Sequence, residues 1–255
     1  MLLCALLMTG CTAGFVTPGG GAVDLREAVG FELDGADYDI AKQLEKRPAA
    51  QFPATLALLR LQDKRYHSRN TNSWRSGNYS VVTMRDVEDE EDLSRLGSMQ
   101  GVRAVAPLNR LVLGELNSEH DMREAAARVH ADALVLYTLE TQFDMDTVIP
   151  VVGLATLGVF PDEAAKVTCT ASAAIIDTRT GYLYAMAEST HDTEQLANGW
   201  TRTDALEQSI RRAERTALSG LIDEIETVWG GVVEVHAPLG GEISPAGWLL
   251  EEGDR

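Results

Sequence analysis

A long stripe of apolar residues near the carboxy-terminal end most constrains how this chain can fold. Its members recur at steps of three and four positions: Leu206, Ile210, Ala213, Ala217, Leu221, Ile225 and Val228. This spacing is typical of an α-helix that turns one face toward a core. Thr203-Asp204 can cap the start of the helix, and Gly230-Gly231 is expected to end it at about Trp229.

Helix and strand patterns alternate before this helix. Ser118 stands three residues before Asp121, which is the arrangement of an amino-terminal cap, and the helix it begins is expected to run to about His130. The apolar run 133–139 that follows alternates only loosely. It therefore predicts a central strand covered on both faces.

A β-hairpin is expected next. Residues 167–176 form an uncharged strand, and 182–188 form a second one. Between them, Asp177 can start a turn by accepting hydrogen bonds from nearby backbone amides. Gly181 can adopt the positive φ that closes a longer hairpin.

The first half of the chain carries shorter patterns. Residues 37–47 predict a surface helix, and the runs 54–59 and 79–84 predict strands. The basic, polar stretch 60–77 is expected to be a loop. Residues 102–113 are expected to form a strand, a turn and a second short strand.

An acidic run precedes one predicted helix. Residues 86–92 contain six acids in seven positions and lead into apolar residues at helical spacing, Leu93, Leu96 and Met99. Carboxylates in a first helical turn are favoured by its exposed amide groups. A calcium site is the alternative, although the run lacks the alternating ligands and the central glycine of an EF-hand loop.

Together these elements predict an α/β fold, with α+β as the alternative. A mixed β-sheet would be packed by helices, with a long helix on the carboxy-terminal side and flexible ends.

The amino terminus resembles a bacterial lipoprotein signal. A continuous apolar run ends in Met8-Thr9-Gly10-Cys11, with small residues directly before the cysteine. The resemblance implies that Cys11 carries a thioether-linked diacylglycerol and an amide-linked acyl chain, which would anchor the chain in a membrane. Thr12 after the cysteine implies the outer membrane, facing the periplasm. The alternative is an apolar amino terminus of a cytosolic protein, since no Lys or Arg precedes the run.

The predicted organisation has four parts. Residues 1–11 form the signal segment, and residues 12–36, which include Gly19-Gly20-Gly21, form a flexible tether. Residues 37–232 form a single α/β domain, and residues 233–255 form an acidic, weakly ordered tail.

The charge balance argues against a nucleic-acid partner. Lys and Arg number 22 against 39 Asp and Glu, which gives a formal net charge of -17. Binding a phosphate backbone needs clustered cations, and this sequence does not offer them.

One uncharged segment is a candidate contact surface. Residues 148–160 are interrupted by Pro150, Gly153 and Gly158, and the segment is too short to span a bilayer as a helix. A buried loop or bent strand pair is one interpretation. The other is an exposed loop that contacts a partner or the membrane through its apolar side chains: Val148, Ile149, Val151, Val152, Leu154, Leu157, Val159 and Phe160.

The order of elements resembles a known group of envelope domains. An alanine-rich helix leading into Ala131-Asp132-Ala133 and an apolar strand ending in the turn 177–181 are similar to the domain of the curli secretion lipoprotein, the penicillin-binding-protein activator lipoproteins and the TolB amino-terminal domain. The resemblance covers about residues 52–230. It implies protein contacts rather than catalysis.

No local catalytic or cofactor motif is present, so no cofactor is expected. The five histidines are scattered, at His67, His120, His130, His191 and His236. His191 lies near Asp192 and Glu194, which reads as a polar loop. Asp144 with Asp146 could hold a cation or simply be solvated, and Cys169 is expected to be a small buried hydrophobe.

The sequence therefore favours a non-enzymatic, lipid-anchored envelope protein that acts in protein binding, scaffolding or assembly. A hydrolase with sequence-distant catalytic residues and a pore-forming secretion oligomer are the alternatives. An envelope protein partner is expected, and a homo-oligomer is a further alternative.

Overall fold

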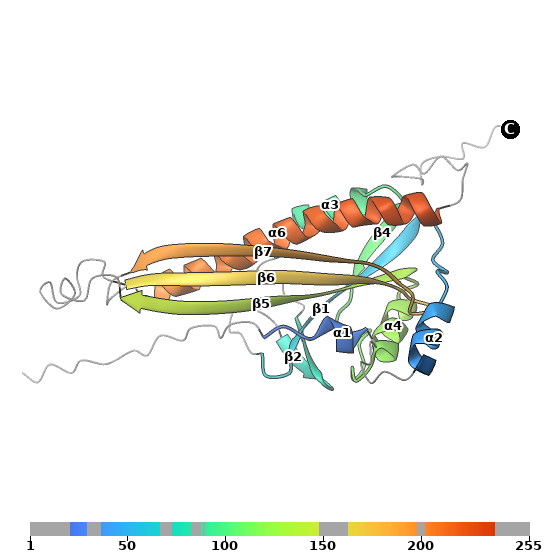
Figure 1. Cartoon of the computed structure of the whole chain (residues 1–255), viewed down its shortest axis with the longest axis horizontal. Coiled ribbons are helices and arrows are strands. Elements are labelled where there is room, and N and C mark those ends of the chain that lie inside the picture. The colour runs from blue at the N-terminus through green and yellow to red at the C-terminus, as the bar shows by residue number, and fades with distance from the viewer. Residues whose placement is uncertain are drawn as a thin grey trace, which may run out of the picture.

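A computed structural model describes residues 21–29, 37–66, 73–82, 88, 90–147, 163–197 and 202–237. These residues form a seven-stranded mixed β-sheet packed by helices (Figure 1), which confirms the predicted fold class. The strand order is β2-β3-β1-β5-β6-β7, and β4 pairs with β1.

The strands are β1 (Ala54–Asp63), β2 (Ser73–Ser76), β3 (Tyr79–Val82), β4 (Val102–Pro107), β5 (Ala133–Thr147), β6 (Glu163–Asp177) and β7 (Leu183–Ala197). The helices are α1 (Leu25–Ala28), α2 (Asp37–Glu45), α3 (Glu90–Ser98), α4 (Glu119–Arg128) and α6 (Arg202–His236).

The sheet combines parallel and antiparallel strand pairing. β1 pairs in parallel with β4 and β5, and α3 and α4 lie between these strands in the chain. β5, β6 and β7 are antiparallel and 15 residues long each. Pairing with β1 ends at Tyr137 of β5. The remaining parts of the three strands, 138–147, 163–172 and 188–197, form a three-stranded extension that we call the arm.

The two faces of the sheet carry two cores. On one face, α6 and α3 pack against β1, β5 and β6, and Trp229 is among the largest fully buried side chains. On the other face, α1 and α4 cover the same strands at the end opposite the arm, with Met122 fully buried. Figure 1 shows α6 on one side of the sheet and α1 and α4 on the other.

The apolar stripe predicted for the last helix is confirmed for Leu206 through Ile225, whose stripe residues are all buried. The predicted end of this helix is wrong, because α6 passes through Gly230-Gly231 and continues to His236. Trp229, Val232 and Val233 are buried, and the Trp229 indole N–H donates to the Gln100 carbonyl at 3.0 Å. Tertiary packing thus outweighs the low helix propensity of two glycines.

Part of the predicted tether belongs to the folded body. Val23, Ala28 and Val29 are buried in the same core cluster as Met122 of α4. The Val23 amide donates to the Thr138 hydroxyl at 3.1 Å. Burial of these three apolar side chains provides the free energy that fixes residues 21–29.

Three further local predictions are corrected. The stretch predicted as a loop, 60–77, contains the end of β1 and all of β2, because residues 73–76 pair with β3. The second short strand expected within 102–113 is instead a turn, in which the Leu113 amide donates to the Asn109 carbonyl at 3.2 Å. His191 lies within β7 rather than in a loop.

The predicted cap of α4 is confirmed. The Asp121 amide donates to the Ser118 hydroxyl, and the Asp121 carboxylate accepts from the Ser118 amide at 2.9 Å. Hydrogen bonds from the Asn117 amide and from the Ser118 hydroxyl and amide to its carboxylate keep the pKa of Asp121 below its ordinary value, although burial alone would raise it.

Candidate functional site

The residues proposed from sequence for membrane and partner contact lie outside the described residues. These are Cys11 and the apolar side chains of 148–160. Their roles therefore stay predictions. Among the described residues, the candidate site lies on the arm.

One face of the arm is packed by α6. Val167, Cys169 and Ala171 of β6 are fully buried. Gly220 lets the helix approach β7 closely, because a Cβ atom there would lie 3.2 Å from the Cβ of Ser189. Burial raises the pKa of the Cys169 thiol to about 12, so the thiol stays protonated and the prediction of a buried hydrophobe is confirmed.

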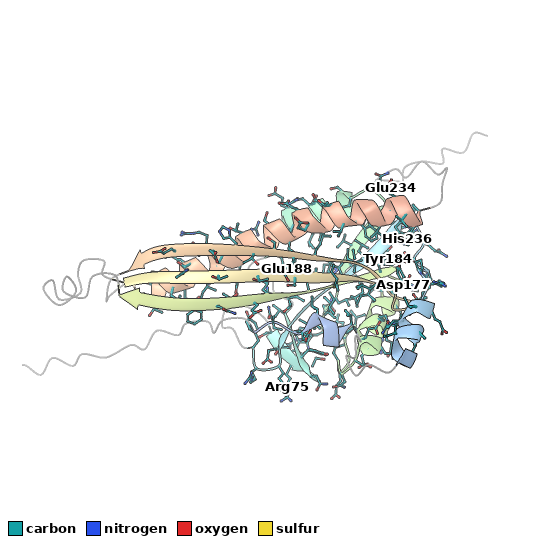
Figure 2. All side chains as sticks on the ribbon, viewed as in Figure 1. Arg75, Asp177, Tyr184, Glu188, Glu234 and His236 are labelled. Atoms are coloured by element: carbon teal, nitrogen blue, oxygen red, sulfur yellow. The ribbon has the colours of Figure 1, made fainter. Side chains whose placement is uncertain are left out.

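The opposite face of the arm is polar and, among the described residues, not covered by any helix or strand. We call it the arm face. Its members are half-buried or exposed: Glu140, Gln142, Lys166, Thr168, Thr170, Ser172, Glu188, Thr190, Asp192 and Glu194. Figure 2 places Glu188 on the long strands, well away from the end of the molecule where Asp177, Tyr184 and His236 gather.

Short hydroxyl side chains occupy the middle of the arm face. The Thr170 and Thr190 hydroxyls are 2.9 Å apart across β6 and β7, and the Ser172 hydroxyl donates to Glu188 at 3.1 Å. Four carboxylates and one lysine surround this centre. The result is a flat, acidic surface with many hydrogen-bonding groups.

Sequence reasoning missed this surface, although half of its signal was visible. In β6, Thr168, Thr170 and Ser172 alternate with buried residues, which is the period of a strand with one solvated face. In β7, Ser189 and His191 on the α6 side are polar too, so this strand shows no alternation.

A buried ionic group lies on the α6 side, where the arm joins the body. Arg60 of β1 is 3% exposed, and its guanidinium donates to the Glu88 carboxylate at 3.0 Å. The Tyr137 hydroxyl donates to the same oxygen at 3.1 Å. Burial acts to lower the pKa of Arg60, but the carboxylates of Glu88 and Glu214 and the two nearby tyrosines outweigh it and raise the pKa.

A second polar tie joins the arm to α6. The Thr141 hydroxyl of β5 donates to the buried Glu214 carboxylate at 3.0 Å. Arg60, Thr141 and Glu214 thus place three hydrogen-bonding or charged groups within a largely apolar interface. Such groups fix the register between helix and sheet, because a shift would leave them without partners.

Asp177 holds the end of the sheet opposite the arm. Its carboxylate accepts from the amides of Arg179 and Thr180, as predicted for the turn, and also from the Ala49 amide at 2.6 Å. The Tyr184 hydroxyl donates to it at 2.7 Å. Burial alone would raise the pKa of Asp177, but these four donors keep it below its ordinary value.

The described histidines lie on separate parts of the fold. His120 is in α4, His130 follows α4, His191 is in β7 and His236 ends α6. Within the described ranges, no three His, Cys, Asp or Glu residues come close enough together to hold a metal ion.

The calcium interpretation of the acidic run gains no support from its members Glu88, which is half-buried, and Asp92, which is buried. Glu88 pairs with Arg60, and Asp92 lies 3.5 Å from the Arg215 guanidinium. Both carboxylates are therefore directed toward arginines.

None of the described helices combines the length and apolarity that crossing a bilayer requires.

Comparisons with known proteins give weak similarities to solved structures, among them the following two. No protein-family model matches the chain, and no curated protein sequence matches it. A hypothetical protein of Chlamydia trachomatis is 12% identical with a TM-score of 0.31, over 68% of this chain and 97% of that one. A Xanthomonas campestris protein of the DUF330 family is 12% identical with a TM-score of 0.30, over 73% and 91%. Because both TM-scores are below 0.5, neither similarity bears on function.

Proposed function

We propose that this chain is a non-enzymatic, lipid-anchored protein of the bacterial envelope that binds a protein partner along the arm face. The observation that carries the proposal is the asymmetry of the arm: α6 packs against one face, and the other face is polar and uncovered among the described residues. The ten residues that each of the three strands contributes to the arm make this surface about 33 Å long when fully extended.

The chemistry of the arm face suits recognition. Its threonine, serine and glutamine groups donate and accept hydrogen bonds, and its carboxylates favour a partner with cationic side chains. The arm face is also held rigidly from behind, because Gly220 packs against Ser189 and Thr141 bonds to Glu214. A preformed surface loses little entropy on binding.

The lipid anchor rests on the Cys11 signal. Membrane fractionation with mass spectrometry of the amino-terminal peptide tests it by comparing the native protein with Cys11→Ser. We expect an acylated peptide and a membrane-bound protein, and release into the soluble fraction for the variant. An unmodified Met1 in a soluble native protein would overturn the anchor.

Partner binding is tested by photocrosslinking in cells. A photoreactive residue at Thr190 places the probe on the arm face, and the same residue at exposed Thr227 on α6 is the matched control. We expect a discrete adduct from position 190 and none from position 227. A second copy of this chain in the adduct would identify a homo-oligomer, and equal labelling at both positions would contradict the proposal.

A further inference from the structure

The point where the tether enters the body identifies which side of the molecule faces the membrane. The Gly21 carbonyl accepts from the Asp63 amide at 3.0 Å, at the last residue of β1. Cys11 lies ten residues before Gly21. A chain of that length reaches at most about 35 Å, so a lipid on Cys11 keeps this end of β1 near the bilayer.

The strand register connects this point to the β2–β3 hairpin. Asp63 is paired with Tyr79, and Tyr79 is paired with Ser76. The Ser76 hydroxyl donates to the Gly114 carbonyl at 2.6 Å, which brings the 108–116 loop to the same side. The entry point of the tether, the hairpin and this loop are therefore neighbours.

Cations gather here in a chain whose net charge is -17. We define the basic patch as Lys64, Arg65, Trp74, Arg75, Arg110 and Leu111. All four of its cationic side chains are exposed. In the described stretches 62–66, 73–78 and 108–116 the acids are Asp63, which pairs with Arg65 at 3.2 Å, and Glu115. The local charge is thus opposite in sign to that of the whole chain.

The basic patch also has apolar groups suited to a membrane interface. Leu111 is 95% exposed at the tip of its loop. The Arg110 guanidinium stacks 4.6 Å from the centre of the half-buried Trp74 ring. A protruding leucine, a tryptophan and flanking arginines are what an anionic bilayer surface attracts. Figure 2 places Arg75 on the far side of the molecule from α6 and from His236.

We propose that the basic patch rests on an anionic phospholipid surface, with Leu111 inserted between the headgroups. This rests on the proposed lipid anchor and adds to it an orientation. The β2 edge of the sheet then faces the bilayer, and the β7 edge lies away from it. An acidic protein domain is the competing occupant of the basic patch.

Depth measurement in vesicles tests the orientation. The acylated protein, its amino-terminal peptide verified by mass spectrometry, is reconstituted in vesicles of phosphatidylethanolamine and phosphatidylglycerol. A bimane probe is attached to Leu111→Cys or, as a control, to Val235→Cys, which is 73% exposed at the end of α6. Brominated lipids should quench the probe at position 111 and not at 235. Equal quenching at both positions, or none at 111 in acylated protein, would overturn the proposal.

Charge variants separate the basic patch from the anchor. In the full-length Cys11→Ser protein, binding to the same vesicles should be weaker by at least about 25-fold in Arg75→Glu/Arg110→Glu, because each lost arginine accounts for about fivefold and the two glutamates are repelled by the anionic lipid. Arg103→Glu/Arg212→Glu, with the same charge change at exposed sites on β4 and α6, should bind as the parent does. If both double variants weaken binding equally, or if the parent does not bind, the basic patch is not a lipid surface. An unacylated native peptide would refute the lipid anchor but not the basic patch, because the comparison of charge variants uses the Cys11→Ser protein and does not depend on acylation.

Discussion

Asp177 joins three separate segments through one carboxylate. It accepts from the turn after β6, from Ala49 before β1 and from Tyr184 of β7. Since the carboxylate is fully buried, its ionised form depends entirely on these donors.

Replacing Asp177 with Asn should lower stability at pH 7 by about 1–3 kcal/mol, because a charged acceptor of four hydrogen bonds is lost. The pKa of Asp177 is lower in the folded state, so its contribution is complete above the unfolded value of about 3.9 and disappears as pH falls through the folded value. Urea unfolding at several pH values measures this difference. A cost that is the same at pH 3 and pH 7 would contradict the assignment. Tyr184→Phe removes one of the four donors to Asp177 and the acceptor of the Ala50 amide, and it should cost less.

The buried pair of Arg60 and Glu88 gives a second residue-scale prediction. Arg60→Met leaves the Glu88 carboxylate without its cation and should cost about 3–5 kcal/mol. Arg60→Met/Glu88→Gln removes both charges and should recover much of that loss. Denaturant unfolding of the single and double variants measures the coupling. Additive losses would show that the two groups do not interact.

Local chemistry explains which residue-scale features the sequence predicted. The Ser118 cap and the turn bonds of Asp177 involve residues at most three positions apart, so the pattern alone predicts them. The contacts of Asp177 with Ala49 and of Arg60 with Glu88 span 128 and 28 positions. Only the assembled sheet brings these partners together.

At the scale of single elements, the glycines of α6 have opposite roles. Gly230 and Gly231 are exposed within the helix, and a Cβ atom at either would meet nothing within 4 Å. Gly220 faces β7, where a Cβ atom would crowd Ser189.

Gly230→Ala should therefore stabilise the protein by about 0.5–1 kcal/mol, because alanine loses less backbone entropy in a helix. Gly220→Ala should show no such gain and should lower the melting temperature. Combining Gly220→Ala with Ser189→Gly makes room for the new Cβ atom and should restore part of the lost stability. Thermal unfolding by circular dichroism compares the variants. An equal gain at positions 220 and 230 would show that the helix does not approach β7 closely.

Contacts with distant parts of the chain explain why some elements were predicted poorly. Gly230-Gly231 is a stop signal by composition, but Trp229 and Val233 beside it are buried against the end of β1 and α3. β2 has only four residues, Ser-Trp-Arg-Ser, and is a strand because of its pairing with β3. Pairing partners and helix-covering surfaces cannot be seen in a local pattern.

The whole molecule is strongly acidic, and its arm face adds carboxylates to a long, narrow structure. Repulsion among these charges destabilises the folded state and is screened by salt over about 10 Å at 0.1 M. Raising NaCl from about 10 mM to about 200 mM should therefore raise the melting temperature by a few degrees.

A neutralised arm face provides the control. Glu188→Gln/Asp192→Asn/Glu194→Gln should melt at a higher temperature in low salt than the parent and should respond less to added NaCl. A melting temperature that falls as salt is added would mean that surface ion pairs such as Arg128–Glu124 outweigh the general repulsion.

Helix α6 extends along most of the part of the molecule that the structure describes (Figure 1). α6 is a single helix of 35 residues, about 52 Å long, and no proline interrupts it. Glu214 accepts a hydrogen bond from Thr141 of the arm, and toward the other end of the helix Trp229 donates one to the Gln100 carbonyl. Because the helix is continuous and bonded at both places, we expect a displacement of the arm to move α6 as a rigid body and so to shift the loop around Gln100 as well.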